Sequence, residues 1–185
     1  GREVARRVAS LGARVIAVKR NPPRPGEANL EPVAGGGVLG DRIEMVWGEA
    51  GLDAVYRESD AVVVAAPDTP ATRGLVDAAA LGRMKRGAVL INVARGSLVD
   101  EGALVAALEA GTIRGAGLDV FSTEPLPAEH PLWALPNVVM TPHVSAVTRG
   151  FWAREADLIV HNIEHFLTGA PATEWLNVVD KRAGY

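Results

Sequence analysis

Short apolar runs alternate with amphipathic segments along most of the chain. The runs are rich in Val, Ile, Leu and Ala, a composition typical of strands buried in a parallel sheet. Segments of helical period separate them, so we expect an α/β fold with helices on both faces of a doubly wound parallel sheet. The predicted strands are Arg14–Val18, Ile43–Val46, Ala61–Ala66, Ala88–Val93, Ile113–Val120 and Val138–Thr141.

Five helices are predicted before, between and after these strands. Asp100 is placed to cap the fourth and Gly111 to end it, while Gly169 and Pro171 end the last. The helices are Arg2–Leu11, Gly51–Glu58, Asp77–Met84, the segment from Asp100 to Gly111, and Thr148–Thr168. Their predicted apolar faces contain Val4, Val8 and Leu11 in the first helix, Leu104, Val105 and Leu108 in the fourth, and Trp152, Ala156, Ile159, Val160, Ile163 and Phe166 in the last.

The segment Asn21–Gly40 interrupts this alternation. It is rich in Pro and Gly and has no apolar period, so we expect a loop. The glycine triplet Gly35–Gly37 lies inside it without a strand directly before it. We therefore interpret the triplet as part of the loop and not as a turn that cradles phosphate.

Composition narrows the class of protein. A chain of 185 residues with 48% hydrophobic and 22% charged residues is expected to be one globular domain with a real core. The formal net charge of -3 provides no basic surface for nucleic acid, and the absence of cysteine excludes disulfides and thiolate metal sites. The longest apolar run, Ala61–Ala66, is far shorter than the ~20 residues that span a bilayer. We expect no membrane partner and a cytoplasmic protein.

The first residues resemble the end of a dinucleotide-binding turn and the helix that follows it. A helix that opens at Gly1 is typical of the segment after the third glycine of a G-x-G-x-x-G motif, and Lys19 lies 18 residues later, close to the ~20 expected for the residue that selects the ribose. On this interpretation the sheet lacks its first strand and the chain lacks a substrate domain. We therefore expect residues 1–170 to be an incomplete NAD(P)-binding domain that does not catalyse turnover by itself, and residues 171–185 to be a tail that returns to the missing domain.

Three polar residues follow successive predicted strands, at the edge where parallel sheets bind ligands. Arg95 follows Ala88–Val93, and its guanidinium could hold a carboxylate through two parallel hydrogen bonds. Glu124 and His143 follow the next two strands. By itself, Arg95 is as readily a surface residue of a loop, and an isolated histidine near a strand end more often has a structural role.

An imidazole at this edge suits the reduction of a carbonyl group. When a hydride reaches the carbonyl carbon, the oxygen needs a proton, and an imidazole with an ordinary pKa of about 6.5 can give or take one near neutrality. A carboxylate on the other ring nitrogen orients the ring and favours the imidazolium. The joint occurrence of Arg95, Glu124 and His143 therefore favours catalysis over three unrelated structural roles.

The ordered block INVARGSLVDEGALVAALEAGTIRGAGLDVFSTEPLP, followed by NVVMTPHVSAVT, resembles the signature region of the D-isomer-specific 2-hydroxyacid dehydrogenases. The similarity extends over the whole chain, and HVSAVTR and NVVDKRAGY are similar to the glyoxylate/hydroxypyruvate reductase branch. The resemblance implies that Arg95 binds the substrate carboxylate, that His143 is the acid/base and that Glu124 is its partner. It also implies cofactor contacts at Ala66, Pro67, Val93, Ala94, Asp119, Ser145 and Ala146.

For Asp119 and for the pair Ser145–Ala146, more specific roles in cofactor binding are expected. The resemblance implies that Asp119 holds the nicotinamide carboxamide. The pair Ser145–Ala146 departs from the Gly-containing pair of many members and is expected to tighten the nicotinamide side of the pocket.

The second strand runs into Lys19 and Arg20, where NAD-preferring folds carry an acidic residue. Two cations attract a ribose 2′-phosphate that a carboxylate would repel, so we expect NADP to be preferred, with NAD possible. The alternative is a solvated basic pair at a strand end.

The sequence leaves a rival function open, a non-catalytic NAD(P)-sensing or corepressor-like protein on the same fold. The retained Arg, Glu and His favour an enzyme, for which we expect a small 2-oxo or 2-hydroxy acid as substrate and a homodimer as the assembly. His161 and His165 have the spacing of half a metal site but no placed third ligand, so no metal is expected. We expect His130 to be a solvated loop residue.

Overall fold

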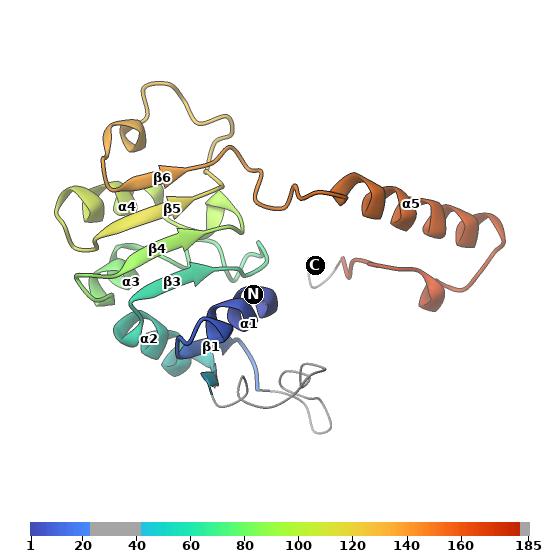
Figure 1. Ribbon diagram of the computed structural model, residues 1–185, viewed down its shortest axis with the longest axis horizontal. Coiled ribbons are helices and arrows are strands. Elements are labelled where there is room, and N and C mark those ends of the chain that lie inside the picture. Colours follow the sequence, from blue (N-terminus) through green and yellow to red (C-terminus); the bar gives the residue numbers. More distant parts are fainter. Residues whose placement is uncertain (23–41, 182–185) are drawn as a thin grey trace.

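Six parallel strands form two separate sheets in the computed structural model, which describes residues 1–22 and 42–181. Figure 1 shows strands and helices alternating along the chain, as the sequence predicts. The glycine triplet and most of the predicted loop 21–40 lie outside the described residues. The strands are β1 (Val15–Lys19), β2 (Ile43–Trp47), β3 (Ala61–Val64), β4 (Val89–Asn92), β5 (Gly115–Leu118) and β6 (Val138–Met140). The helices are α1 (Arg2–Ser10), α2 (Gly48–Glu58), α3 (Ala78–Arg83), α4 (Glu101–Glu109) and α5 (Phe151–Leu167), with 3-10 turns at Gly96–Leu98, Pro131–Ala134 and Ala172–Glu174.

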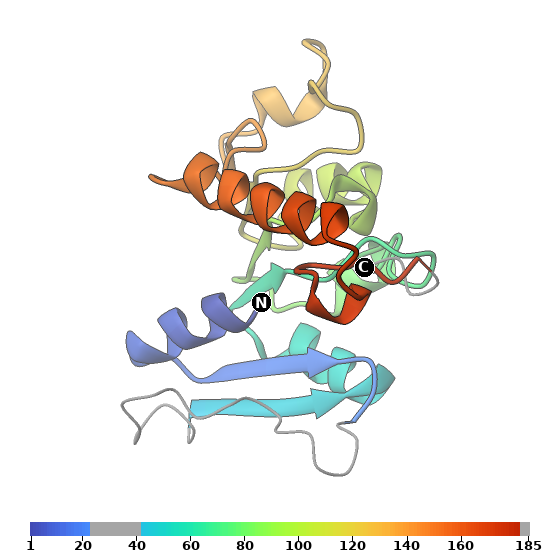
Figure 2. The ribbon, with the colours of Figure 1, turned by 90° about the vertical axis from the view of Figure 1, so that its right-hand side faces the viewer.

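The sheet is divided between β1 and β3. β1 pairs only with β2 among the described strands, while β3, β4, β5 and β6 pair in that order. Figure 2 shows the β1–β2 pair below the four-stranded sheet. Among the described strands, β1 and β3 are therefore each paired on one side only, which agrees with the expectation that the sheet lacks its first strand. The doubly wound α/β class is likewise confirmed, with α1 on one face and α2, α3 and α4 on the other.

The core lies between the four-stranded sheet and the helices α2, α3 and α4. Its most deeply buried large side chains include Tyr56, Leu90, Leu104 and Ile113. The predicted cap of α4 is present, because the Asp100 side chain accepts a hydrogen bond from the backbone N–H of Ala103 at 2.9 Å. This packing fixes the strand ends that form the site.

The predicted apolar face of α1 is only partly correct, because Val4 is half-buried but its other two residues are exposed. Ala5 and Ala9 are buried, whereas Val8 is 37% exposed and Leu11 is 86% exposed. Small side chains let the helix backbone approach the strands closely, so the alanine face packs inward. The fifth strand is also shorter than predicted, because its pairing with β4 covers only Gly115–Leu118, although Ile113 and Val120 remain buried.

Helix α5 leaves the body of the domain, and Figure 1 shows it extending beyond β6. It is an amphipathic helix, as predicted, but none of its residues is buried, and Trp152 is 73% exposed. The segment after it returns along the helix, where the Asn162 side chain donates to the carbonyl of Leu176 at 3.0 Å and accepts from its N–H at 2.9 Å. The role of residues 171–185 as a tail toward another domain stays a prediction. In the described part of the chain, no helix is long and apolar enough to cross a membrane.

Candidate functional site

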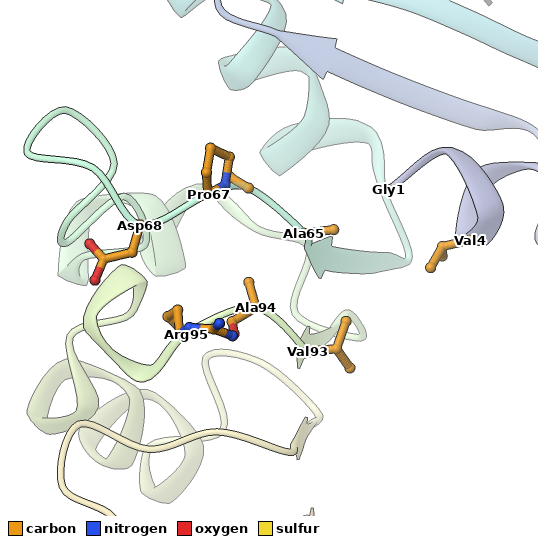
Figure 3. Close-up of a pocket in the computed structure, with 9 residues that line it drawn as sticks. Gly1, Val4, Ala65, Pro67, Asp68, Val93, Ala94 and Arg95 are labelled. Atoms are coloured by element: carbon orange, nitrogen blue, oxygen red, sulfur yellow. The ribbon is translucent and has the colours of Figure 1, made fainter. Parts of the chain in front are cut away.

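The carboxyl ends of the parallel strands lie at one edge of the fold, and an open cavity of about 510 Å³ lies there, a volume ordinary for a ligand site. Figure 3 shows residues that follow β3 and β4 beside the start of α1. At Gly1, an added Cβ would lie 3.8 Å from the Ala65 Cβ, so the helix N-terminus sits close to the end of β3. The lining residues are Gly1, Val4, Ala65, Ala66, Pro67, Asp68, Val93, Ala94 and Arg95.

Arg95 is presented by a turn that a buried amide shapes. Asn92 ends β4 and is only 1% exposed; its side chain donates to the Arg95 carbonyl at 2.9 Å and accepts from the Ala94 N–H at 3.1 Å. Because both hydrogen bonds run to the turn itself, Asn92 fixes where the chain leaves the strand. The Arg95 side chain is exposed at the cavity, with one guanidinium nitrogen 2.7 Å from the Ala94 carbonyl.

Glu124 is held at the turn that follows β5. Its Oε1 accepts a hydrogen bond from the backbone N–H of Phe121 at 2.9 Å, and its Oε2 lies 2.7 Å from Nδ1 of His143. The hydrogen bond with His143, followed by that from Phe121, lowers the pKa of Glu124, and the charge of Arg95 contributes in the same direction. Glu124 is therefore held as a carboxylate beside the imidazole.

His143 is fixed by Asp119, the residue after β5. The His143 N–H donates to the Asp119 carbonyl at 2.8 Å, and His143 has a φ of 54°, an uncommon conformation for a residue with a side chain. Asp119 carboxylate oxygens accept from the N–H groups of Val144 and Ser145, each at 2.9 Å, and from the hydroxyl of Thr141. Asp119 thus holds the loop that carries His143.

The same hydrogen bonds keep Asp119 ionised. Burial opposes ionisation of this carboxyl, which is 3% exposed, but the bonds from Ser145, Thr141 and Val144 outweigh it and lower the pKa of Asp119 to about 2. The carboxylate oxygens accept three hydrogen bonds from this loop, and the contact of Asp119 with a nicotinamide carboxamide stays a prediction.

The other predicted cofactor residues lie along the same edge of the two sheets. Ala66, Pro67, Val93 and Ala94 line the cavity. Lys19 ends β1 opposite Trp47 of β2, and both Lys19 and Arg20 are exposed. Ser145 and Ala146 follow His143 and are exposed as well.

The prediction of a solvated His130 is wrong. Its side chain is 21% exposed, its Nδ1 accepts from the Leu132 N–H at 3.3 Å, and its Nε2 lies 3.5 Å from the Glu101 carboxylate. His130 is held because it precedes the turn Pro131–Ala134, whose Leu132 anchors it in the core. Sequence reasoning also missed Asn92, although a polar residue at the end of an apolar strand is a signal that a buried hydrogen bond is required.

His161 and His165 do not form a metal site with a third ligand. Their rings stack with centroids 4.0 Å apart, and His165 Nδ1 lies 2.8 Å from the His161 carbonyl oxygen. Within residues 1–22 and 42–181, no group of three His, Cys, Asp or Glu side chains could hold a metal ion.

Comparison with known proteins decides the family. Residues 1–145 match the D-isomer specific 2-hydroxyacid dehydrogenase family, NAD binding domain. The chain therefore belongs to the D-isomer specific 2-hydroxyacid dehydrogenases. The family match includes β1 to β6 and the loops that carry Arg95, Glu124 and His143, so the polar residues at these three strand ends lie inside the family's NAD-binding domain.

Relatives within this dehydrogenase family include glyoxylate/hydroxypyruvate reductase A of Salmonella newport, 41% identical over 143 residues, which are 77% of this chain and 44% of that protein. A crystal structure of an NADPH-dependent glyoxylate/hydroxypyruvate reductase from Sinorhizobium meliloti, with NADP and sulfate, matches with a TM-score of 0.82 and 34% identity over 100% of this chain and 54% of that one. A family member from Xanthobacter autotrophicus, with NADPH and MES, matches with a TM-score of 0.73 and 42% identity over 91% of this chain and 61% of that one. The chain spans about half the length of such relatives.

Proposed function

We propose that this chain is the nucleotide-binding part of an oxidoreductase that transfers a hydride between NADPH and a small 2-oxo acid. The observation that carries the proposal is the contact of 2.7 Å between His143 and Glu124, in loops that follow the neighbouring strands β5 and β6 at the carboxyl edge of the sheet. A protein that only binds a nucleotide has no need of a proton donor oriented by a carboxylate.

The contact with Glu124 supports a separate role for each nitrogen of the His143 ring. Nδ1 faces Glu124, so Nε2 is the nitrogen left to donate a proton to the substrate. In reduction, the carbonyl carbon receives the hydride that NADPH supplies when bound, and the carbonyl oxygen takes the proton from His143, which yields a hydroxyl group. Glu124 stabilises the imidazolium before this transfer and returns no proton itself.

Arg95 is proposed to bind the substrate carboxylate. Its exposed guanidinium follows β4, adjacent in the sheet to the strand that precedes Glu124. A planar guanidinium can hold a carboxylate through two hydrogen bonds, which would orient the neighbouring carbonyl group. The reductases among the relatives act on glyoxylate and hydroxypyruvate, and both of these 2-oxo acids are the substrates we propose.

NADP fits the residues along this edge. Small side chains at Ala66, Pro67 and Ala94 leave the cavity open beside the N-terminus of α1, where backbone N–H groups favour a phosphate. Lys19 and Arg20 would attract the ribose 2′-phosphate. The Sinorhizobium meliloti and Xanthobacter autotrophicus structures contain NADP and NADPH, respectively, which supports NADP as the preferred cofactor, with NAD possible. We further propose a homodimer in the cytoplasm.

The test is turnover by the full-length protein, followed by the loss of NADPH absorbance with glyoxylate, hydroxypyruvate and a panel of other 2-oxo acids. We expect reduction of at least one acid, and a large loss of rate with the methyl ester of the same acid, which offers Arg95 no carboxylate. A non-catalytic sensor would bind NADPH and reduce none of the panel, and that result would reject the proposal.

A further inference from the structure

The turn that carries Glu124 is held from the opposite side by the first residue of α4. The Ser122 N–H donates to Oε1 of Glu101 at 2.6 Å, and one residue earlier the Phe121 N–H donates to Glu124 itself. The Glu101 side chain is only 15% exposed. A carboxylate so far removed from water is costly unless hydrogen bonds compensate it, and Ser122 supplies one of them.

His130 engages the other oxygen of Glu101. Since Nδ1 of His130 accepts from the Leu132 N–H, the proton of a neutral ring lies on Nε2, the nitrogen 3.5 Å from Oε2 of Glu101. The segment from Phe121 to Leu132 is thereby tied to α4 at two points. Both ties converge on the single carboxylate of Glu101.

Helix capping does not account for this arrangement. Asp100 already caps α4 by accepting from Ala103, and the Glu101 side chain bonds to a loop that lies 21 residues further along the chain. A negative charge in the first turn of a helix is favourable wherever its carboxylate points. The specific feature of Glu101 is its reach to Ser122.

The backbone of Gly96, the residue after Arg95, packs closely against the same turn. At Gly96, an added Cβ would lie 2.0 Å from the carbonyl carbon of Phe121 and 2.4 Å from the Ser122 nitrogen, which no side chain could accommodate without a shift. The backbone after Arg95 is therefore in direct contact with the backbone before Glu124. A displacement of the turn would move Glu124 relative to both Arg95 and His143.

We propose that Glu101, supported by His130, is a positioning residue that holds the Phe121–Glu124 turn so that the Glu124 carboxylate meets His143. The kinetic part of this inference rests on the proposed function, whereas the structural part does not. The hydrogen bond and the ion pair of the Glu101 side chain run to Ser122 and His130, so Glu101 acts through the turn.

Two substitutions of Glu101 separate the effect of its side-chain length from the effect of its negative charge. Glu101→Gln keeps an oxygen for the Ser122 N–H and loses the charge, while Glu101→Asp keeps the charge at the helix start and shortens the side chain. If Glu101 positions the turn, the Asp variant should lower kcat about 10- to 100-fold, as expected for a small misplacement of catalytic groups, and the Gln variant should stay within a few-fold of wild type. A role limited to helix stability predicts the reverse order. Glu109→Ala, an exposed acid of the same helix, is the matched control and should leave kcat unchanged.

The carboxyl titration of Glu124, followed by carbon NMR without substrate, tests the structural part. Hydrogen bonds from His143 and Phe121 lower the pKa of Glu124, so loosening the turn should return it toward its ordinary value in Glu101→Asp but not in Glu101→Gln or Glu109→Ala. His130→Ala should change the titration in the same direction and by less. An unchanged Glu124 titration in Glu101→Asp, whatever its melting temperature, would overturn the inference. If that titration shifts while the wild-type protein reduces no 2-oxo acid, the proposed function fails and the positioning role stands.

Discussion

Nδ1 of His143 lies 2.7 Å from Oε2 of Glu124, although 19 residues separate them in the chain. The contact forms because β5 and β6 are parallel neighbours, so the loops that follow them leave the same edge of the sheet. The Asp119 carboxylate accepts a hydrogen bond from the His143 loop at the Val144 N–H, and Glu124 accepts one from the Phe121 N–H. The pair is fixed by hydrogen bonds on both partners.

Replacing His143 by alanine removes the proposed proton donor. We expect kcat for reduction to fall by roughly 10²–10⁴, the usual effect of losing a positioned acid, while the Kd for NADPH changes little. Steady-state kinetics and fluorescence titration measure the two quantities. His161→Ala, on α5, is the control. Near-normal kcat in His143→Ala at its optimum pH would exclude His143 as the acid.

Replacing Glu124 by glutamine should move the pH dependence of reduction. The hydrogen bond with His143 lowers the pKa of Glu124, so in wild type the carboxylate stays ionised below the ordinary range of a glutamate and is protonated only in stronger acid. The amide of the Gln variant carries no charge at any pH, so the rate of reduction should fall near neutral pH and should lose the decline that protonation of Glu124 causes in acid. A pH profile of kcat measures the change, and an acid limb that is the same in both proteins would show that Glu124 does not act through His143.

Arg95 should affect binding and orientation of the acid together. Arg95→Ala is expected to raise KM for the 2-oxo acid and also to reduce kcat, because the substrate loses its fixed orientation. Arg95→Lys should recover only part of the loss, since an ammonium lacks the planar pair of donors. Arg86→Ala, an exposed arginine before β4, is the control. Equal kinetics in wild type and Arg95→Ala would assign Arg95 to the surface.

Lys19 and Arg20 should select the cofactor. In the double variant Lys19→Ala with Arg20→Ala, kcat/KM for NADPH should fall while that for NADH changes little, because only NADPH carries the 2′-phosphate. Titrating salt provides a second measurement, since the wild-type preference should weaken as ionic strength screens the charges. If the ratio of the two kcat/KM values is the same in both proteins, the basic pair is merely solvated.

Asp119 should contribute stability that disappears in acid. Its folded pKa of about 2 lies below the ordinary value, so its hydrogen bonds act in full above about pH 4 and are lost as the pH falls through about 2. This difference corresponds to about 2 kcal/mol of unfolding free energy near neutral pH. Urea unfolding of Asp119→Asn should show a loss of that order at pH 7 and a smaller one at pH 3. Asp157→Asn, on the exposed part of α5, should show neither.

The order of strands and helices was predictable because each buried element carries its own apolar period. The strand ends then placed Arg95, Glu124 and His143 on one edge, since parallel strands point the same way. The predicted face of α1 was only partly correct for a related reason. The period shows that a helix has an apolar side. It does not show that Ala5 and Ala9 are buried while Val8 is exposed, because that depends on how closely the helix approaches the sheet.

The sequence by itself determined the fold class, the three polar strand ends and the basic pair Lys19–Arg20, because these depend on local patterns. Only the tertiary structure decided which loops meet. The bond from Ser122 to Glu101 and the close approach of Gly96 to Phe121 join segments whose patterns give no sign of each other. Such contacts depend on the order of strands in the sheet and on backbone groups that every residue carries, so no side-chain pattern reports them.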